Sequence, residues 1–335
     1  MSHRTLALAV STSLATAALV ALAPTVSAAP STSSGSFDVD TSAAGPNACE
    51  DHTTLSGTES VQVAPNGVPR QVGQLRTGTV HDPADPGPRT SVTNRAGGTA
   101  TIRSQGGRLV SADIALRTAL KMAKPAPTSC NAYSMQSVEL GFTFTIDEPG
   151  WFTADIDNRR AGELATGLDT PGTQDWYHET DHPYDSASLR TYLVAGTYFF
   201  HTEVRRGHSV ETGNLDTAGT ASVRVGFTEA GAATSAAVGG GRTFVALPDA
   251  RDCAGNAVAA AFKQSARKVR KATFYVNGAK KKTVRTPKKG QTVRLTGLAD
   301  AKAATVRSVV VLKPARKGKP SKVKTVTRSY AACSA

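Results

Sequence analysis

One string in the sequence matches a catalytic motif, the formal H-E-x-x-H of His178-Glu179-x-x-His182. In zinc peptidases this spacing works because a helix places both imidazoles on one face, with the glutamate beside them as general base. The flanking residues argue against a helix, because Pro183 follows directly and a Pro-Gly pair at 171–172 lies just upstream. We therefore interpret the string as part of a solvated loop. A zinc-dependent metallohydrolase that uses these three residues is the alternative function.

The acidic stretch around this string is the candidate ligand loop of the chain. Its carboxylates would suit calcium, which prefers hard oxygen donors, and its aromatic rings would suit a sugar face. The candidate ligand residues are Asp175, Trp176, Tyr177, His178, Glu179, Asp181, His182, Tyr184 and Asp185. Calcium is the one cofactor that the composition suggests, and its candidate ligands are Asp155, Asp157, Asp175 and Asp181. The competing interpretation is that these acids only keep a loop soluble.

Other side chains with catalytic potential form no recognisable pattern. His52, His81, His201 and His208 are far apart in the sequence, and we interpret each as a structural or surface residue. The sequence has no G-x-S-x-G nucleophile elbow and no phosphate-binding loop. We therefore predict no catalytic residue and a non-enzymatic protein.

The charge of the chain is divided unequally between its two parts. Residues 251–335 contain 22 Lys+Arg and 2 Asp+Glu, a net +20, which leaves 17 basic and 24 acidic residues, or −7, for residues 1–250. Few aromatic residues are interleaved for base stacking, so we expect no specific nucleic-acid partner. The expected partners are anionic cell-wall or extracellular polymers, and the expected contacts are Lys280, Lys281, Lys282, Lys288, Lys289, Lys317 and Lys319. A charged surface that provides solubility and protects edge strands is the open alternative.

The first 28 residues have the pattern of a signal peptide. A short positive segment, Ser2-His3-Arg4, precedes an apolar run from Leu6 to Leu22, and Val26-Ser27-Ala28 supplies the small-residue cleavage pattern. No later apolar stretch is long enough to span a bilayer, so we expect no transmembrane segment in the mature chain. The sequence thus predicts a secreted, extracellular protein that associates with the cell wall.

Four cysteines bracket two regions of the sequence. Cysteines of an exported chain meet an oxidising environment, and an even number fits disulfides. Four cysteines allow three connectivities; we expect Cys49–Cys130 and Cys253–Cys333, because each of these pairs encloses one candidate domain. No two cysteines lie within the short spacing of a zinc knuckle.

Strand patterns dominate both regions. Alternating apolar and polar residues, broken by Gly and Pro turns, predict strands at 98–104, 109–116, 138–146, 151–156, 188–193, 197–204 and 221–227. The basic region repeats the pattern at 257–262, 271–277, 279–285, 291–295, 304–312 and 322–330. Asn277-Gly278 between two such runs is typical of a type I′ hairpin turn. Residues 116–124 are the one place where one or two helical turns are expected, ended by Pro125.

Two family resemblances follow from these strands. FTFTIDEPGWFTADI, an acidic loop and LRTYLVAGTYFFHTEV resemble the bacterial pre-peptidase C-terminal type of β-sandwich, over roughly residues 138–227. The resemblance implies an accessory domain of a secreted protein, in some members stabilised by calcium. The opening Cys253, the TFYVNG hairpin and the closing TVTRSYAAC resemble the immunoglobulin-like module of secreted actinobacterial proteins. That second resemblance implies an architecture rather than a chemistry.

Together these features predict an all-β protein with two β-sandwich domains after a signal peptide, a jelly-roll-like N-terminal domain and an immunoglobulin-like C-terminal domain. The expected division is a signal peptide at 1–28, a flexible leader at 29–47, an acidic sandwich at 48–230, a Gly/Ala linker at 231–242 and a basic sandwich at 243–335. The predicted function is binding or adhesion, with the basic domain associating with anionic cell-envelope polymers.

Overall fold

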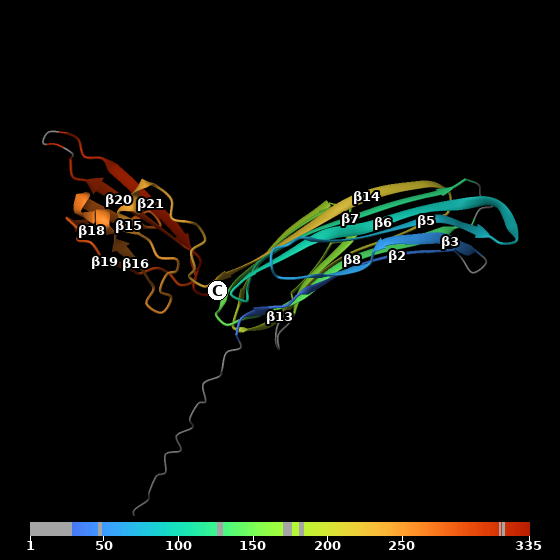
Figure 1. The fold of residues 1–335 in the computed structure, drawn as a ribbon, viewed down its shortest axis with the longest axis horizontal. Coiled ribbons are helices and arrows are strands. Elements are labelled where there is room, and N and C mark those ends of the chain that lie inside the picture. The colour runs from blue at the N-terminus through green and yellow to red at the C-terminus, as the bar shows by residue number, and fades with distance from the viewer. Residues whose placement is uncertain are drawn as a thin grey trace, which may run out of the picture.

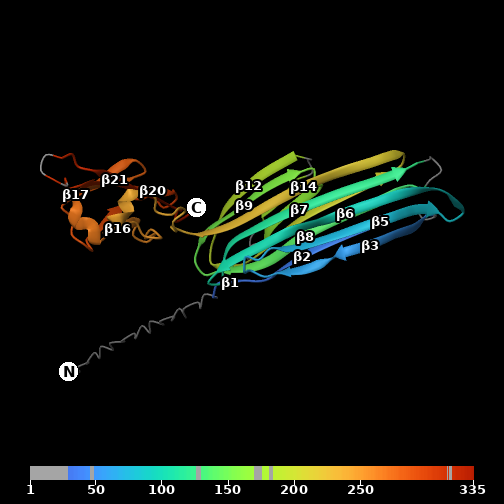
Figure 2. The same cartoon turned by 45° about the horizontal axis from the view of Figure 1, so that its top comes forward.

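The computed structural model describes residues 29–45, 49–125, 130–169, 176–180, 184–314, 316 and 319–335, apart from the side chains of residues 85 and 86. These residues form an all-β protein with two bodies placed end to end, a long one built from β1–β14 and a smaller one built from β15–β21 (Figures 1 and 2). The predicted signal peptide lies outside the described residues, as do Asp175, Asp181, His182 and Lys317.

The long body is a sandwich of two antiparallel sheets, each with seven strands among the described residues. The first sheet has the order β11-β10-β13-β8-β2-β4, with β1 beside β8, and the second has the order β12-β9-β14-β7-β6-β5-β3. The bounds are β1 Ser31–Thr32, β2 Gly35–Ala44, β3 Glu50–Thr58, β4 Ser60–Val63, β5 Arg70–Asp82, β6 Asp85–Gln105, β7 Arg108–Lys124, β8 Ala132–Ile146, β9 Gly150–Arg159, β10 Glu163–Asp169, β11 Trp176–Thr180, β12 Tyr184–Leu193, β13 Gly196–Val210 and β14 Gly213–Glu229.

Alternation of side chains along these strands explains the core of the long body. In β8 every second residue is buried, because successive side chains of a strand point to opposite faces. The buried rings of Phe142, Phe144, Phe152 and Phe200 pack against one another from β8, β9 and β13, with centroids 5.4–6.2 Å apart. The apolar faces of the two sheets therefore meet at this aromatic cluster.

The smaller body is a sandwich of a three-stranded and a four-stranded sheet, with the orders β15-β16-β19 and β18-β17-β20-β21. Phe262 of one sheet meets Phe274 of the other edge to face, with ring centroids 5.9 Å apart. The bounds are η1 Gly240–Thr243, β15 Val245–Ala246, β16 Ala257–Phe262, η2 Gln264–Lys268, β17 Val269–Val276, β18 Ala279–Arg285, β19 Thr292–Thr296, β20 Ala304–Leu312 and β21 Val323–Tyr330, where η marks a 3₁₀ helix.

The fold class and the cysteine pairing agree with the expectations from the sequence. Disulfides join Cys49 to Cys130 and Cys253 to Cys333. Asn277 and Gly278 have positive φ angles of 49° and 83°, as a type I′ turn between β17 and β18 requires. Among the described residues, no helix is long and apolar enough to cross a membrane.

Three local expectations are wrong. The predicted flexible leader at 29–47 contains β1 and β2, and β2 lies inside the first sheet, where Phe37 and Val39 are buried. The helical turns expected at 116–124 are the second half of β7, which pairs with both β6 and β14. In each case pairing with neighbouring strands outweighs the local composition.

The predicted linker at 231–242 is also an ordered part of the smaller body. The Ala233 amide donates to Asp249 O at 2.7 Å, and the Val238 amide donates to Thr327 O at 3.0 Å. Residues 240–243 then form η1, which packs against β21. The Gly- and Ala-rich composition reflects close packing against the backbone of β21, because a Cβ at Gly239 would lie 2.3 Å from Thr325 O.

Candidate functional site

The described part of the H-E-x-x-H string lies on a strand, β11, and neither on a helix nor in the solvated loop that we expected from the sequence. Successive side chains of a strand alternate between its faces. His178 points inward with Thr180, whereas Glu179 points to the exposed face. Because His178 and Glu179 face opposite sides of the sheet, they cannot serve one metal ion as ligand and base, and the basis for a zinc-peptidase helix is lost.

The inward side of β11 is occupied by packing contacts. Trp176 packs on the core and stacks with His178, with ring centroids 6.2 Å apart. His178 Nε2 lies 3.9 Å from Asp185 Oδ2 on β12, the edge strand of the opposite sheet. Thr180 is buried and accepts a hydrogen bond from Asn158 Nδ2 at 2.8 Å. These contacts close the sandwich at its edge.

The outward side of β11 carries the exposed members of the predicted ligand set. Tyr177 and Glu179 lie on this face, and contact with Glu179 raises the pKa of the Glu163 carboxyl on β10. Loss of solvation, and next its contact with Glu179, raise the pKa of Tyr177. Tyr184 belongs to β12 and has the Arg160 guanidinium 5.0 Å from its ring centroid. The aromatic residues therefore do not form one continuous platform.

The four aspartates proposed for calcium are not shown to meet. Asp155 and Asp157 lie on β9, where Ser188 Oγ donates to Asp155 at 2.6 Å and Arg159 donates to Asp157 at 2.9 Å. The carboxylates of Asp155 and Asp157 are therefore already engaged by side chains of the second sheet. Asp175 and Asp181 lie outside the described residues, so the complete calcium set stays a prediction.

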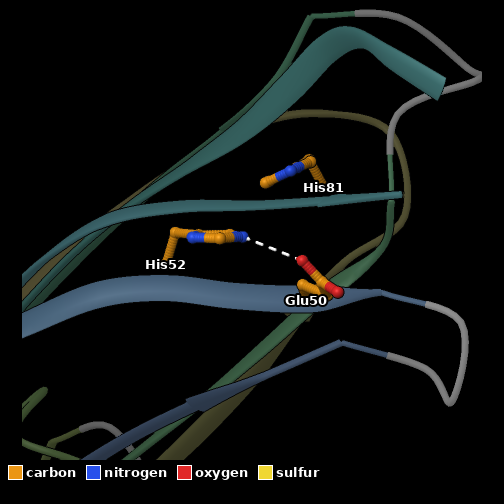
Figure 3. A group of neighbouring side chains, drawn as sticks. All are labelled: Glu50, His52 and His81. Atoms are coloured by element: carbon orange, nitrogen blue, oxygen red, sulfur yellow. Dashed lines mark hydrogen bonds and ion pairs between the residues drawn. The ribbon is translucent and has the colours of Figure 1, made fainter. Parts of the chain in front are cut away.

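Two histidines that we interpreted separately from the sequence, His52 and His81, come together with Glu50. Glu50 and His52 on β3 meet His81 on β5 (Figure 3), because Glu50 pairs directly with His81 in the antiparallel register. The only sequence signal was the spacing of Glu50 and His52, which places both on one face of a strand. His81, the third member, is brought next to them by the pairing of β3 with β5.

The smaller body has a groove of about 660 Å³ between the end of η2 and the hairpin of β20 and β21. Two backbone hydrogen bonds join the segments that line it, from the Lys313 amide to Lys268 O at 2.8 Å and from the Leu312 amide to Lys322 O at 2.9 Å. Its lining combines apolar residues with five exposed cationic side chains, and we call these five the groove cations: Arg267, Lys268, Lys313, Lys319 and Lys322.

No described carboxylate neutralises the groove cations. Residues 251–335 contain only two acids, Asp252 and Asp300. Asp252 binds Arg294 at 2.6 Å, and Asp300 accepts a hydrogen bond from Asn256 at 3.1 Å. The third acid of the smaller body, Asp249, pairs with Arg328. No described acid is therefore left for the five cations, which line the groove together with Leu312, Pro314 and Pro320.

The predicted lysine contacts are distributed over three places in the smaller body. Lys280, Lys281 and Lys282 are exposed on β18, the edge strand of the four-stranded sheet. Lys288 and Lys289 lie in the exposed turn before β19. Of the predicted contacts, only Lys319 lines the groove, and Lys317 lies outside the described residues. The other four groove cations were not among the predicted contacts, and the approach of Arg267 and Lys268 to the groove depends on the packing of η2.

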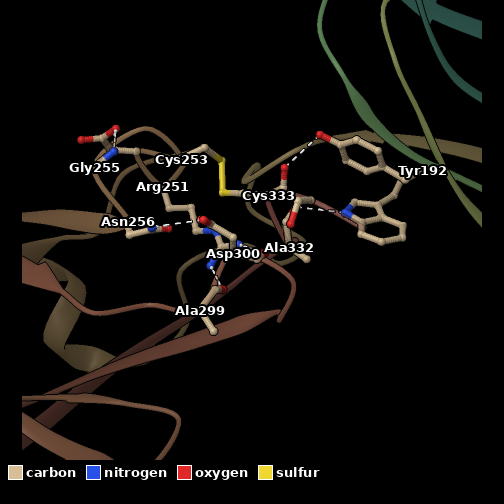
Figure 4. Close-up of a disulfide and its surroundings, with 12 residues drawn as sticks. Tyr192, Arg251, Cys253, Gly255, Asn256, Ala299, Asp300, Ala332 and Cys333 are labelled. Carbon is tan, nitrogen blue, oxygen red and sulfur yellow. Dashed lines mark hydrogen bonds between the residues drawn. A yellow bond between two sulfur atoms is a disulfide. The ribbon is translucent and has the colours of Figure 1, made fainter.

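The smaller body is joined to the long one through hydrogen bonds to its C-terminal tail (Figure 4). Trp151 Nε1–H donates to Ala332 O, and the Tyr192 hydroxyl donates to Cys333 O, both at 2.9 Å. The Arg190 guanidinium covers the Trp151 ring at 4.3 Å from its centroid. Cys333 is itself held by its disulfide to Cys253, so the tail cannot move independently of the smaller body.

Comparisons with known proteins leave both predicted resemblances untested. No protein-family model matches the chain, and no curated protein matches it. Among solved structures, the adhesin domain of Epf from Streptococcus pyogenes aligns over 88% of this chain and 96% of that domain, with 8% sequence identity and a TM-score of 0.16. A TM-score of this size does not establish a shared fold, so function is argued below from the residues of this chain.

Proposed function

We propose that this protein is a secreted, non-enzymatic binding protein that attaches to anionic polymers of the cell envelope through the groove of its smaller body. The observation that carries the proposal is the set of five groove cations without a described carboxylate partner. Such a cluster attracts polyanions, and its attraction acts beyond direct contact. The signal-peptide pattern and the two disulfides favour a place outside the cell.

The size of the groove suits a segment of a polymer better than a free ion. Its volume of about 660 Å³ lies within the range of small-molecule sites, which is roughly 300–1,000 Å³. Leu312 and the two prolines among the lining residues would contact the carbon backbone of a polymer. The cations at the rim would then pair with phosphates or carboxylates that repeat along it.

The strength expected of these contacts is moderate. An exposed ion pair contributes about 0.2–1 kcal/mol, so the loss of three groove cations should weaken binding by roughly 0.6–3 kcal/mol. Because about 1.4 kcal/mol corresponds to a tenfold change in affinity, the expected loss is roughly threefold to 150-fold.

A sedimentation assay with purified cell walls tests the proposal. The triple variant Lys313→Gln/Lys319→Gln/Lys322→Gln removes three groove cations and should bind the walls more weakly than the natural chain by that factor. The matched control is Lys280→Gln/Lys281→Gln/Lys282→Gln, which removes the same charge from the edge strand β18. We expect the control to keep most of the binding.

Two results would refute a site in the groove. One is equal loss in both triple variants, which would indicate attraction to the net charge alone. The other is unchanged binding when the three groove cations are absent. Circular dichroism of each variant would verify that the β structure is retained.

A further inference from the structure

We propose that Glu50, His52 and His81 form a binding site for a divalent transition-metal ion, with Zn²⁺ as its best-suited occupant. In the described part of the chain, this is the one group of three His, Cys, Asp or Glu side chains whose ligand atoms all lie within 4.8 Å of one another. His52 Nε2 is 3.1 Å from Glu50 Oε2, and the rings of His52 and His81 stack with centroids 4.4 Å apart (Figure 3).

The distances are close to those a metal ion requires. Zn–N and Zn–O bonds of about 2.0–2.1 Å place neighbouring ligands of a tetrahedral ion about 3.3 Å apart. Glu50 and His52 already meet this distance, and the His81 ring, which now stacks on His52, would turn toward the other two ligand atoms to complete the set. Coordination through His52 Nε2 would place the hydrogen of that neutral ring on Nδ1.

One imidazole nitrogen in the cluster has no hydrogen-bond partner among the described residues. His81 Nδ1 is shielded from solvent, and it has no hydrogen-bond partner among the described residues. A polar nitrogen in this condition loses its bonds to water and gains none in return, which costs free energy. A metal ion beside the ring would supply an interaction that no described residue supplies to this nitrogen.

The backbone around the cluster is held in place before any ion arrives. Cys49, the residue before Glu50, is tied to Cys130 by a disulfide. The ladder between β3 and β5 runs without interruption from Glu50–His81 to Thr58–Gly73. A preordered backbone lowers the conformational entropy lost on binding.

The donor set decides the class of ion. Imidazole nitrogens with one carboxylate suit Zn²⁺, Ni²⁺ or Cu²⁺, whereas Ca²⁺ and Mg²⁺ prefer oxygen ligands alone. Half of the His52 side chain is exposed, so the fourth position of a tetrahedral ion would be open to water. Cysteine takes no part, since all four cysteines of the chain are in disulfides.

Such an ion would stabilise the edge of the second sheet. β3 is the edge strand, and none of its residues is buried. It is therefore held by its ladder with β5 and by the disulfide at its start rather than by core packing. An ion bridging Glu50 and His52 on β3 to His81 on β5 would add a cross-strand link at the end of the strand that carries the disulfide.

Calorimetric titration of the untagged, metal-free protein with Zn²⁺ tests this inference. We expect one Zn²⁺ per chain. His81→Gln and the near-isosteric Glu50→Gln should each weaken binding by at least about 100-fold, since loss of an outer-shell partner alone typically costs 10- to 100-fold. The matched control, His208→Gln, removes a histidine from β13 of the other sheet and should bind Zn²⁺ like the natural chain.

A second readout separates loss of the site from loss of the fold. Saturating Zn²⁺ should raise the melting temperature of the natural chain and of His208→Gln, and it should leave that of His81→Gln unchanged. The inference is wrong if the natural chain binds no Zn²⁺ at 100-micromolar concentrations, or if Glu50→Gln and His81→Gln bind it with the natural affinity.

Discussion

The disulfide between Cys253 and Cys333 should account for much of the stability of the smaller body. It closes a segment with a sequence separation of 80 residues. In the chain-entropy model, a loop of this length restricts the unfolded state by about 4.5 kcal/mol at 25 °C. We expect the double variant Cys253→Ser/Cys333→Ser to lose up to about that amount of unfolding free energy.

The tryptophans of the chain provide the assay. Trp151 donates to Ala332 O, next to Cys333, so its fluorescence reports on the attachment of the C-terminal tail. The chain has two tryptophans, so in a Trp176→Phe background Trp151 is the sole reporter. Urea unfolding of the double variant should then show the Trp151 transition at a markedly lower urea concentration.

The other disulfide offers a matched control. Cys49 and Cys130 have nearly the same separation, 81 residues, and belong to the long body. Cys49→Ser/Cys130→Ser should therefore leave the stability of the smaller body unchanged. A shift of less than about 1 kcal/mol in the free energy of unfolding on loss of Cys253–Cys333 would refute the reasoning.

Three further outcomes are expected. Trp151→Phe removes the hydrogen bond to Ala332 and should destabilise the junction by about 1–2 kcal/mol, seen as faster proteolysis between the two bodies. Loss of solvation, followed by repulsion from the facing Glu203, raises the pKa of Glu139, so its charge destabilises the fold as pH rises through that pKa. Glu139→Gln should therefore add about 0.2–1 kcal/mol to the free energy of unfolding at neutral pH and nothing at pH 3. Urea unfolding at both pH values measures the difference. His178→Ala should leave the zinc stoichiometry unchanged in atomic absorption, and loss of zinc in this variant would restore the metallohydrolase alternative.

The strands of the smaller body could be predicted closely from the sequence. β16, β18 and β20 have the expected bounds, and Asn277-Gly278 fixes the turn between β17 and β18. In these strands the local residue pattern agrees with the final strand pairing. Where the two agree, the bounds of a strand can be predicted from the sequence.

The long body contains strands whose residues gave no such signal. β2 and β3 are rich in Ser, Thr, Gly and Ala, a composition shared with flexible segments. The second half of β7 contains Leu116, Leu120 and Met122, strong helix formers that are nevertheless buried on one face of a strand. Only the pairing partners of these segments decide their structure, and a single sequence does not identify them.

The candidate sites could not be predicted either, because they too depend on how distant segments of the chain pair and pack. Glu50 and His81 are neighbours only through the register of β3 with β5. The groove cations come from η2 and from a hairpin more than 40 residues later in the chain. The sequence could show that the region is basic, but it could not show which cations share one surface.

The most direct test of the proposed function compares binding to intact cell walls with binding to the same walls after their anionic polymers have been extracted. The natural chain should bind intact walls at 50 mM salt, lose that binding steeply toward 500 mM salt, and fail to bind extracted walls at either concentration. Equal retention on intact and extracted walls, or retention that salt does not change, would contradict attachment through the groove cations.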